Sequence, residues 1–262
     1  GPEALETSHD GDELMDDRSL ETTDAEPTAA QWLVSRSQGP YAAGSAFLHA
    51  PSFAFQALGG GENQLIQTGR HLEGMDVSVR LFHSWTDRLI DARVLHLFGM
   101  SREGLELARA AKSRNVPVVL SPICWYEPRS LWALEPTVAR KLAAIGLWSL
   151  RRGVPAFPSW RRDLLRLADR VMPNSEVEAD QLVQTFGVDR KRITIVPNGV
   201  LPDFGWGSPQ LFRDRVGDFE FVLFVGRVEP RKNPLGVIRA TRRLGLPLVV
   251  VGEAPPQHEN YE

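Results

Sequence analysis

Two cations that follow an apolar strand are the residues whose types and spacing point most directly to chemistry. Residues 219–225 form an apolar run typical of a buried strand, and Arg227 and Lys232 follow it closely. In parallel α/β sheets, ligands bind outside the carboxyl ends of the strands. Gly226 lets a ligand approach the backbone, and a helix is predicted to begin at Asn233-Pro234. Two cations beside a helix N-terminus predict a diphosphate site, and the alternative is a solvated basic loop.

A glycine run earlier in the chain is the second candidate for phosphate binding. Gly59, Gly60 and Gly61 immediately precede a stretch to Leu72 in which Leu65, Ile66 and Leu72 recur at helical spacing. Glycines bring backbone amides close to a ligand, and a helix N-terminus attracts anions. We therefore expect this loop to contact phosphate groups of a ligand. A flexible turn before a helix is the alternative.

Four further residues are weaker candidates. Asn174 and Ser175 follow a short predicted strand at 170–173, but a capping box of Ser175 with Glu178 explains Ser175 without any ligand. Asn198 precedes Gly199 in a predicted tight turn that needs a positive φ at Gly199, and ligand contact by Asn198 is the other interpretation. Gly252 ends the last predicted strand.

The elements that must position these residues alternate between strands and helices. Apolar runs predict strands at 46–50, 77–81, 94–98, 116–120, 170–173, 193–196, 219–225 and 246–251. Helices are expected between many of them: one is capped by Ser101 and runs to about Arg114, and another pattern covers 136–168 with a break near Pro155 and Pro158. This alternation predicts an α/β fold with mostly parallel sheets.

The chain divides into four predicted regions. Residues 1–26 carry ten acidic side chains and one basic one, so we expect 1–40 to be a disordered acidic tail. Residues 41–200 form the first domain, and 201–218, rich in Gly, Pro and Asp, form a connection. The final region, 219–262, holds one strand–helix–strand unit, which is too small to build its own core. We therefore expect an incomplete second domain.

Four motifs, taken together, resemble a known enzyme family. In chain order they are Gly59–Glu62, Pro173–Glu176, Val196–Val200 and Phe224–Arg227, the last followed by Lys232-Asn233. Their order and spacing are similar to those of GT4-type retaining glycosyltransferases of GT-B fold, over about residues 47–252. The resemblance implies two Rossmann-like domains, an acceptor-side one at 41–200 and the start of a donor-binding one at 219–262.

The resemblance also implies roles for individual residues. Arg227 and Lys232 would hold the diphosphate of a nucleotide-sugar donor and stabilise the leaving group, which makes them the catalytic candidates. Donor phosphate contacts are further expected from Gly59, Gly60, Gly61, Gly226 and Asn198, with acceptor contact as the alternative for the three-glycine loop. No metal and no other cofactor is expected, because two fixed cations supply the charge. The product would be a sugar transferred to a hydroxyl of a saccharide or lipid-linked acceptor, with retention of configuration.

The chain departs from the family pattern in two places. Many members have a histidine after the strand that matches 116–120, whereas here the sequence continues Ser121-Pro122-Ile123-Cys124. His96 lies inside an apolar strand and is interpreted as a core residue. The family's glutamate pair near the donor sugar lies past the end of this chain, so the fragment alone is expected to be inactive. Two alternatives stay open: another GT-B enzyme, such as an inverting transferase or epimerase, and a non-catalytic scaffold completed by another chain.

Charge and composition indicate which compartment and which kinds of binding partner to expect. The net charge is −3, the hydrophobic fraction is 42%, and the one cysteine, Cys124, can form no internal disulfide. These values fit a cytoplasmic protein. Residues 140–170 hold eight basic and two acidic side chains with Trp148, Phe157 and Trp160 among them, which suggests membrane association on the cytoplasmic face. A solvated helical surface is the simpler interpretation, and no nucleic-acid-binding module accompanies the charge.

Overall fold

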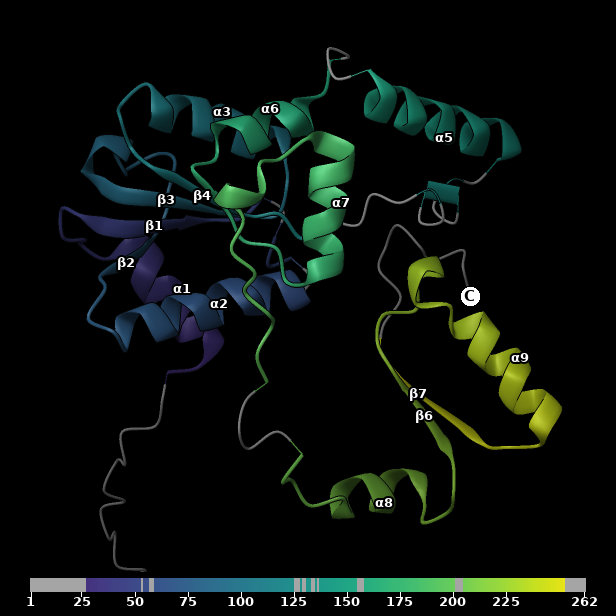
Figure 1. The fold of residues 1–262 in the computed structure, drawn as a ribbon. Helices are drawn as coiled ribbons and strands as arrows, with labels where there is room; N and C mark the ends of the chain where they lie inside the picture. The colour runs from purple at the N-terminus through teal and green to yellow at the C-terminus, as the bar shows by residue number, and fades with distance from the viewer. Residues whose placement is uncertain are drawn as a thin grey trace, which may run out of the picture.

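The computed structural model describes residues 27–52, 54–56, 59–124, 128, 131–132, 135, 137–154, 158–200 and 205–252. Its strands form two separate sheets, both parallel, and helices cover them (Figure 1). The predicted α/β class is therefore confirmed. The acidic residues 1–26, and Glu253 to the end of the chain, lie outside the described residues.

The larger sheet has five strands in the order β2-β1-β3-β4-β5. The strands are β1 (Ser45–His49), β2 (Val79–Leu81), β3 (Ala92–Phe98), β4 (Val118–Ser121) and β5 (Arg170–Val171). From β1 the chain continues to β2 at one edge of the sheet. It then crosses back, and β3, β4 and β5 are added in order on the other side of β1. Because all five strands are parallel, their carboxyl ends share one edge, where ligands bind in such sheets.

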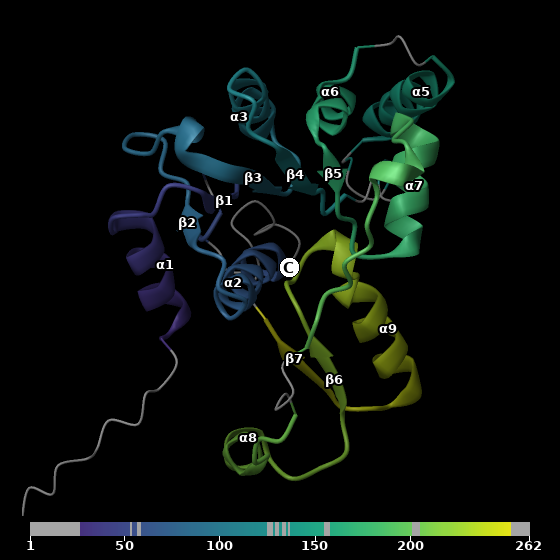
Figure 2. The same ribbon diagram turned by 60° about the vertical axis from the view of Figure 1, so that its left-hand side comes forward.

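Helices cover both faces of this sheet, in three layers (Figure 2). One face packs against α1 (Ala29–Gln38) and α2 (Gly60–Glu73), and the other against α3 (Arg102–Lys112) and α6 (Trp160–Leu167). Neighbouring strand residues point to opposite layers: Phe47 joins the cluster with α3 and α6, whereas Leu48 joins the cluster with α1 and α2. Two further helices, α5 (Val138–Gly153) and α7 (Glu176–Phe186), lie beyond the β5 edge.

The predicted tail 1–40 is wrong for residues 29–38, which form α1. Thr28 caps this helix, and Trp32 is buried at 2% exposure in the apolar cluster with α2. The Trp32 indole N–H donates to Glu73 Oε2 at 2.8 Å. An aromatic side chain with a partner for its polar end stabilises a short helix that has little intrinsic stability.

The predicted strand at 193–196 forms only an isolated bridge between Ile193 and Val171. The amides of Thr194 and Val196 still donate to the carbonyls of Val171 and Pro173, at 3.0 and 2.9 Å. The neighbouring strand β5 is only two residues long, and Pro173 and Pro197 have no N–H to extend a ladder. Residues 193–196 therefore have the apolar pattern of a strand, but β5 offers too few residues for them to pair with.

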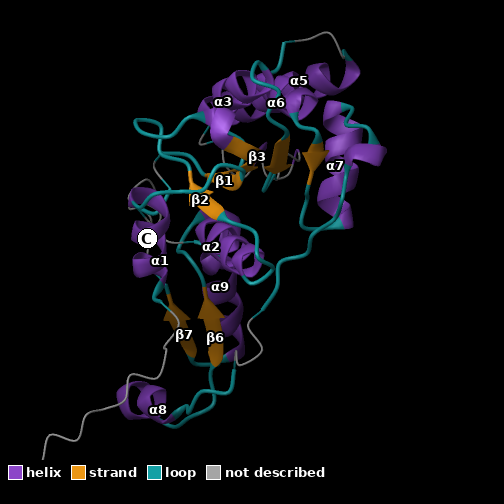
Figure 3. Ribbon diagram, turned by 90° about the vertical axis from the view of Figure 1, so that its left-hand side faces the viewer, coloured by secondary structure: helices purple, strands orange, loops and turns teal. Residues whose placement is uncertain are grey.

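The second unit consists of β6 (Val222–Val225), α9 (Pro234–Leu244) and β7 (Leu248–Val251), with β6 and β7 paired in parallel. Both strands point toward the N-terminal unit (Figure 3). Part of the predicted connection 201–218 is the helix α8 (Gln210–Val216), which buries none of its residues, and 201–204 lie outside the described part. Three short 3-10 helices complete the described elements: η1 (Leu89–Asp91), η2 (Arg190–Arg192) and η3 (Pro230–Lys232).

Candidate functional site

Two glycines join the carboxyl ends of β6 and β7. The Gly226 N–H donates to the Val251 carbonyl at 2.9 Å, and both Gly226 and Gly252 adopt φ values near +150°, at +152° and +153°. A Cβ added to Gly252 would overlap with the Gly226 carbonyl oxygen. Only glycine fits these two positions without strain. The backbone conformation and packing therefore explain the glycine at position 252 without any ligand.

The predicted cations lie in the loop that Gly226 opens. Arg227 is half-buried, and Lys232 is exposed at the end of η3. Asn233 then caps α9 in the left-handed conformation, with its side-chain oxygen accepting the Gly236 N–H at 3.2 Å, and Pro234 occupies the first helical position as predicted. The positive end of the α9 dipole therefore lies in the same loop as both cations, which favours an anion.

The glycine loop meets Arg227 across the junction between the two units. Gly59 precedes the first residue of α2, and its N–H donates to Glu62 Oε2 at 2.9 Å. A Cβ added to Gly59 would overlap with the Arg227 guanidinium and lie 3.1 Å from its Cζ atom. The structure thus brings together two site residues that are 168 positions apart in the sequence. Figure 2 shows α2 between the larger sheet and the second unit.

The other two glycines of this loop face different surroundings. A Cβ at Gly60 would meet nothing within 4 Å, so its backbone is open to a ligand. A Cβ at Gly61 would lie 3.4 Å from Ile123 Cδ1, in the loop that follows β4. The start of α2 therefore faces the second unit on one side and the β4 loop on the other.

Glu178 was predicted to complete a capping box, but it has a different role. Ser175 does cap α7, because its hydroxyl accepts the Glu178 N–H at 3.2 Å. The Glu178 carboxylate, however, accepts the Asn174 N–H at 2.8 Å and the Cys124 N–H at 2.6 Å. The prediction is therefore wrong for Glu178: its side chain does not accept the N–H of the N-cap residue Ser175, as a capping box requires, but bridges two loops. Asn174 and Ser175 are thus explained structurally by these contacts.

Two titratable core residues lie near the carboxyl edge of the larger sheet. His96 bonds to Ser121 Oγ through Nε2 at 2.9 Å, stacks on Phe98, and is neutral because burial lowers its pKa to about 4. The interpretation of His96 as a core residue agrees with these contacts. Burial also raises the pKa of the Cys124 thiol to about 12, and the Glu178 charge adds to the effect. A thiol held protonated is a poor nucleophile.

Asn198 and Gly199 belong to the segment that links the two units. Both are exposed in an irregular segment between the bridge at Ile193 and the second unit. Gly199 does not adopt a positive φ, so the predicted tight turn is wrong. The bonds of Thr194 and Val196 hold the preceding residues extended, and the segment continues without turning back.

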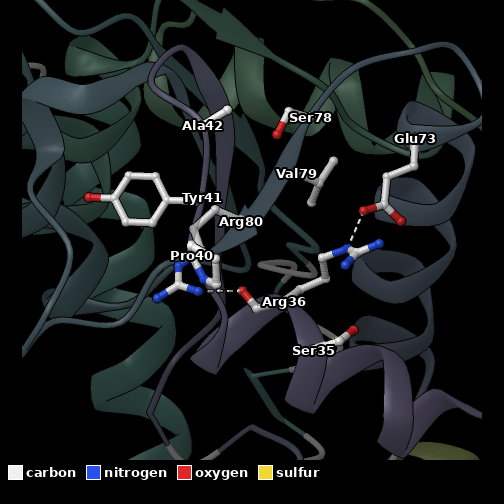
Figure 4. A pocket seen from close by; sticks show the side chains of 9 residues that line it. All are labelled: Ser35, Arg36, Pro40, Tyr41, Ala42, Glu73, Ser78, Val79 and Arg80. Carbon is white, nitrogen blue, oxygen red and sulfur yellow. Dashed lines mark hydrogen bonds and ion pairs between the residues drawn. The ribbon is translucent and has the colours of Figure 1, made fainter.

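A hollow lies at the opposite edge of the sheet, beside the amino ends of β1 and β2. It has a volume of about 250 Å³, and Arg36, Tyr41, Glu73 and Arg80 are among its lining residues (Figure 4). Arg36 pairs with Glu73, and the Arg80 guanidinium donates to Asp87 Oδ1 at 2.7 Å and to the Gly39 carbonyl at 2.7 Å. These charged side chains already have partners, so the hollow is interpreted as structural.

The Arg80–Asp87 pair fixes the edge of the sheet. Burial on its own would raise the pKa of Asp87, but the bonds from Arg80, the His83 amide and Thr86, with the Arg80 charge, outweigh it and lower that pKa. The same pairing raises the pKa of Arg80. Both groups are therefore charged at neutral pH, and neither is available to a ligand.

Within the described residues, no three His, Cys, Asp or Glu side chains are grouped so that they could hold a metal ion. None of the helices in the described part is both long and apolar enough to span a bilayer. Sequence reasoning predicted the glycine loop and the cations as site residues, and the structure places Gly59 against Arg227. It missed the bridge made by Glu178, for which the only signal was a glutamate in the first turn of a helix that follows a strand.

Comparisons with known proteins agree on one class. The profile of the family described as "Glycosyl transferase 4-like domain" matches residues 60–199. The D-inositol 3-phosphate glycosyltransferase of Mycolicibacterium smegmatis is 38% identical over 135 residues, which are 47% of this chain and 31% of that protein. Its counterpart in Mycobacteroides abscessus is 37% identical over 123 residues, 44% of this chain and 28% of that protein. The chain thus matches less than a third of the length of these curated relatives.

A solved structure titled as a glycosyltransferase from Rickettsia africae aligns with 83% of this chain and 62% of its own. Its sequence identity is 13% and its TM-score is 0.39, which is too low to support an argument about the fold.

Proposed function

Because this chain belongs to the glycosyl transferase 4-like domain family, we propose that its two units contribute to binding a nucleotide-sugar donor at their junction, from which the sugar is transferred to a hydroxyl acceptor. The observation that carries the proposal is the contact of Arg227 with Gly59. It places a cation from the second unit against the amide-rich start of α2. Together with Lys232 and the N-terminus of α9, this arrangement suits a diphosphate.

The proposed chemistry follows from where the charge would develop. As the bond between the sugar and the diphosphate breaks, negative charge grows on the leaving phosphate oxygens. Arg227 and Lys232 would stabilise that charge, and such preorganised cations are a major source of rate enhancement. In this proposal the cations do the work that a metal ion would otherwise do. Retention of configuration, with attack from the side of the leaving group, is expected from the resemblance to GT4-type enzymes.

The acceptor is proposed to be a saccharide or a lipid-linked hydroxyl compound held by the N-terminal unit. The curated relatives carry D-inositol 3-phosphate in their names. That compound is therefore the first acceptor to test on this chain. It is a small polyol with a phosphate group, so it also serves as a soluble probe of the acceptor side.

The test is calorimetric titration of the chain with UDP and GDP. We expect one of the nucleotides to bind, and an Arg227→Ala, Lys232→Ala double variant to lose about 100-fold in affinity, since each charged hydrogen bond contributes about 1.5–3 kcal/mol. The matched control is Arg239→Ala, Arg242→Ala, which removes two exposed cations from the body of α9. Equal losses in both double variants would show nonspecific charge attraction and would reject the diphosphate site.

We further propose that α5 docks on the cytoplasmic face of a membrane. Six small or apolar residues follow the spacing of one helix face, and all are exposed: Ala139, Leu142, Ala143, Gly146, Leu147 and Leu150. The helix carries four basic side chains and no acidic one. An apolar face flanked by cations is typical of helices that lie in a lipid interface. A second copy would bring these like charges together, so an anionic bilayer is the better match.

Vesicle co-sedimentation tests this contact. The chain should sediment with vesicles of phosphatidylcholine and phosphatidylglycerol but not with phosphatidylcholine alone. A Leu142→Ser, Leu150→Ser variant should bind at least about tenfold more weakly, because burying a leucine is worth about 1.5–3 kcal/mol. Leu244→Ser, which changes an exposed leucine on α9, is the control. Unchanged binding by the α5 variant would refute the docking surface.

A further inference from the structure

Glu178 is a buried carboxylate with two backbone partners from different loops. Its exposure is 1%, and it accepts the N–H of Cys124 after β4 and the N–H of Asn174 after β5. An ionised carboxylate is an acceptor only, and both partners are donors. Glu178 therefore meets the hydrogen-bonding needs of two loops at the carboxyl edge of the sheet.

One of these loops contains a strained residue. Ile123, next to Cys124, has a φ of +47°. A β-branched residue in the left-handed region is a rare and costly conformation that persists only when its surroundings enforce it. The bond from the Cys124 amide to Glu178, at 2.6 Å, lies directly after this residue. The carboxylate thus holds the chain immediately beyond the point of strain.

The strained residue faces the glycine loop. Ile123 Cδ1 is the atom nearest to the Cβ position of Gly61, at 3.4 Å. Any movement of the β4 loop would therefore change the surface presented to the start of α2. Through Asn174, the same carboxylate also ties the loop after β5 to this arrangement.

We infer that Glu178 is a positioning residue, which locks the loops after β4 and β5 together and keeps Ile123 facing Gly61. Only the consequence for ligand binding rests on the proposed function. Two acceptor oxygens are required, because an amide in the same place would offer one acceptor and one donor group. One of the two backbone amides would then face another donor and lose its bond.

The experiment compares Glu178→Gln with Glu176→Gln, a control in the same turn whose side chain is 68% exposed. Hydrogen exchange by NMR is measured for the amides of Cys124 and Asn174, and for β3 as an internal reference. In Glu178→Gln we expect at least one of the two amides to exchange about tenfold faster, with β3 unchanged. Glu176→Gln should exchange like the parent at all these positions.

Ligand binding separates positioning from general destabilisation. Glu178→Gln should bind UDP or D-inositol 3-phosphate about tenfold more weakly than the parent, because Ile123 lies against the glycine loop, and Glu176→Gln should bind both like the parent. Parental exchange at both amides would overturn the inference, and so would faster exchange throughout β3. The exchange measurement needs no ligand. It therefore tests the role of Glu178 even if UDP does not bind and the proposed function is rejected.

Discussion

The Arg227 guanidinium lies against the backbone of Gly59, in the position that a side chain would otherwise occupy. Gly59 has an extended φ of −142°, which any residue can adopt, so glycine is not required there by conformation. It is required by the approach of the Arg227 guanidinium, which would overlap with a Cβ. At the residue scale, therefore, the absence of one methyl group permits the contact that joins the two units.

A Gly59→Ala substitution should damage the site more than the fold. The overlapping atom is the far end of a flexible side chain, so Arg227 can swing away at little cost in stability. We expect the melting temperature to stay close to that of the parent and UDP affinity to fall about tenfold, as for one lost charged hydrogen bond. Gly74→Ala, at the other end of α2, is the control for a glycine change beside this helix, because a Cβ there would lie at ordinary contact distances. Equal UDP affinity in Gly59→Ala and the parent would contradict the role given to Arg227.

His96 should make stability depend on pH. Its pKa is about 4 in the folded chain, against an ordinary value of 6.5, so the unfolded state binds the extra proton more readily. Stability should therefore fall as the pH decreases through this interval, by up to about 3 kcal/mol. Chemical denaturation at several pH values measures it. A His96→Gln variant, which cannot take up the proton, should show a smaller decrease over the same range, and an equal decrease would contradict the assignment.

At the scale of elements, most helix and strand positions follow from local pattern. Ser101 and Ser175 cap α3 and α7, and Asn233-Pro234 begins α9, all at the predicted positions. The errors occur where distant residues decide. Residues 29–38 form α1 because Trp32 finds a place between α2 and the sheet, and 193–196 do not form a strand because β5 offers too few partners.

Trp32→Ala tests whether α1 belongs to the core. We expect a loss of about 3–5 kcal/mol in the free energy of unfolding, as is usual when a buried aromatic side chain is truncated. The Trp32 ring also packs directly against the backbone of Gly69, where a Cβ would overlap with it, so its removal would leave a cavity. Leu33→Ala, a partly buried neighbour on the same helix, should cost less. Stability unchanged by Trp32→Ala would mean that residues 29–38 behave as the predicted tail.

At the scale of the whole molecule, the two units differ in how much they bury. The buried members of both apolar clusters lie between Trp32 and Val188, all in the N-terminal unit. In the second unit, Leu223, Val225 and Val251 are exposed apolar strand residues. The strand–helix–strand unit therefore relies on few packing contacts of its own, in agreement with the expectation that it is too small to form a core.

A chain of residues 27–200 should fold without the second unit. We expect it to melt cooperatively, within a few degrees of the parent, because both core clusters are retained. Residues 205–252 made alone should show no cooperative transition by circular dichroism. A large loss of stability on removing 201–262 would show that the junction contributes more to the fold than the buried surface indicates.

The sequence by itself determined the α/β class, the alternation of elements and the caps of several helices, and it predicted the cations and glycines of the proposed site. These features depend on local periodicity and on residue types whose chemistry does not need a partner to be recognised. Tertiary structure alone decided that Arg227 meets Gly59, that Glu178 bridges Cys124 and Asn174, and that α1 joins the core. Each of these joins residues far apart in the chain, and local pattern contains no information about which distant partner a side chain will meet.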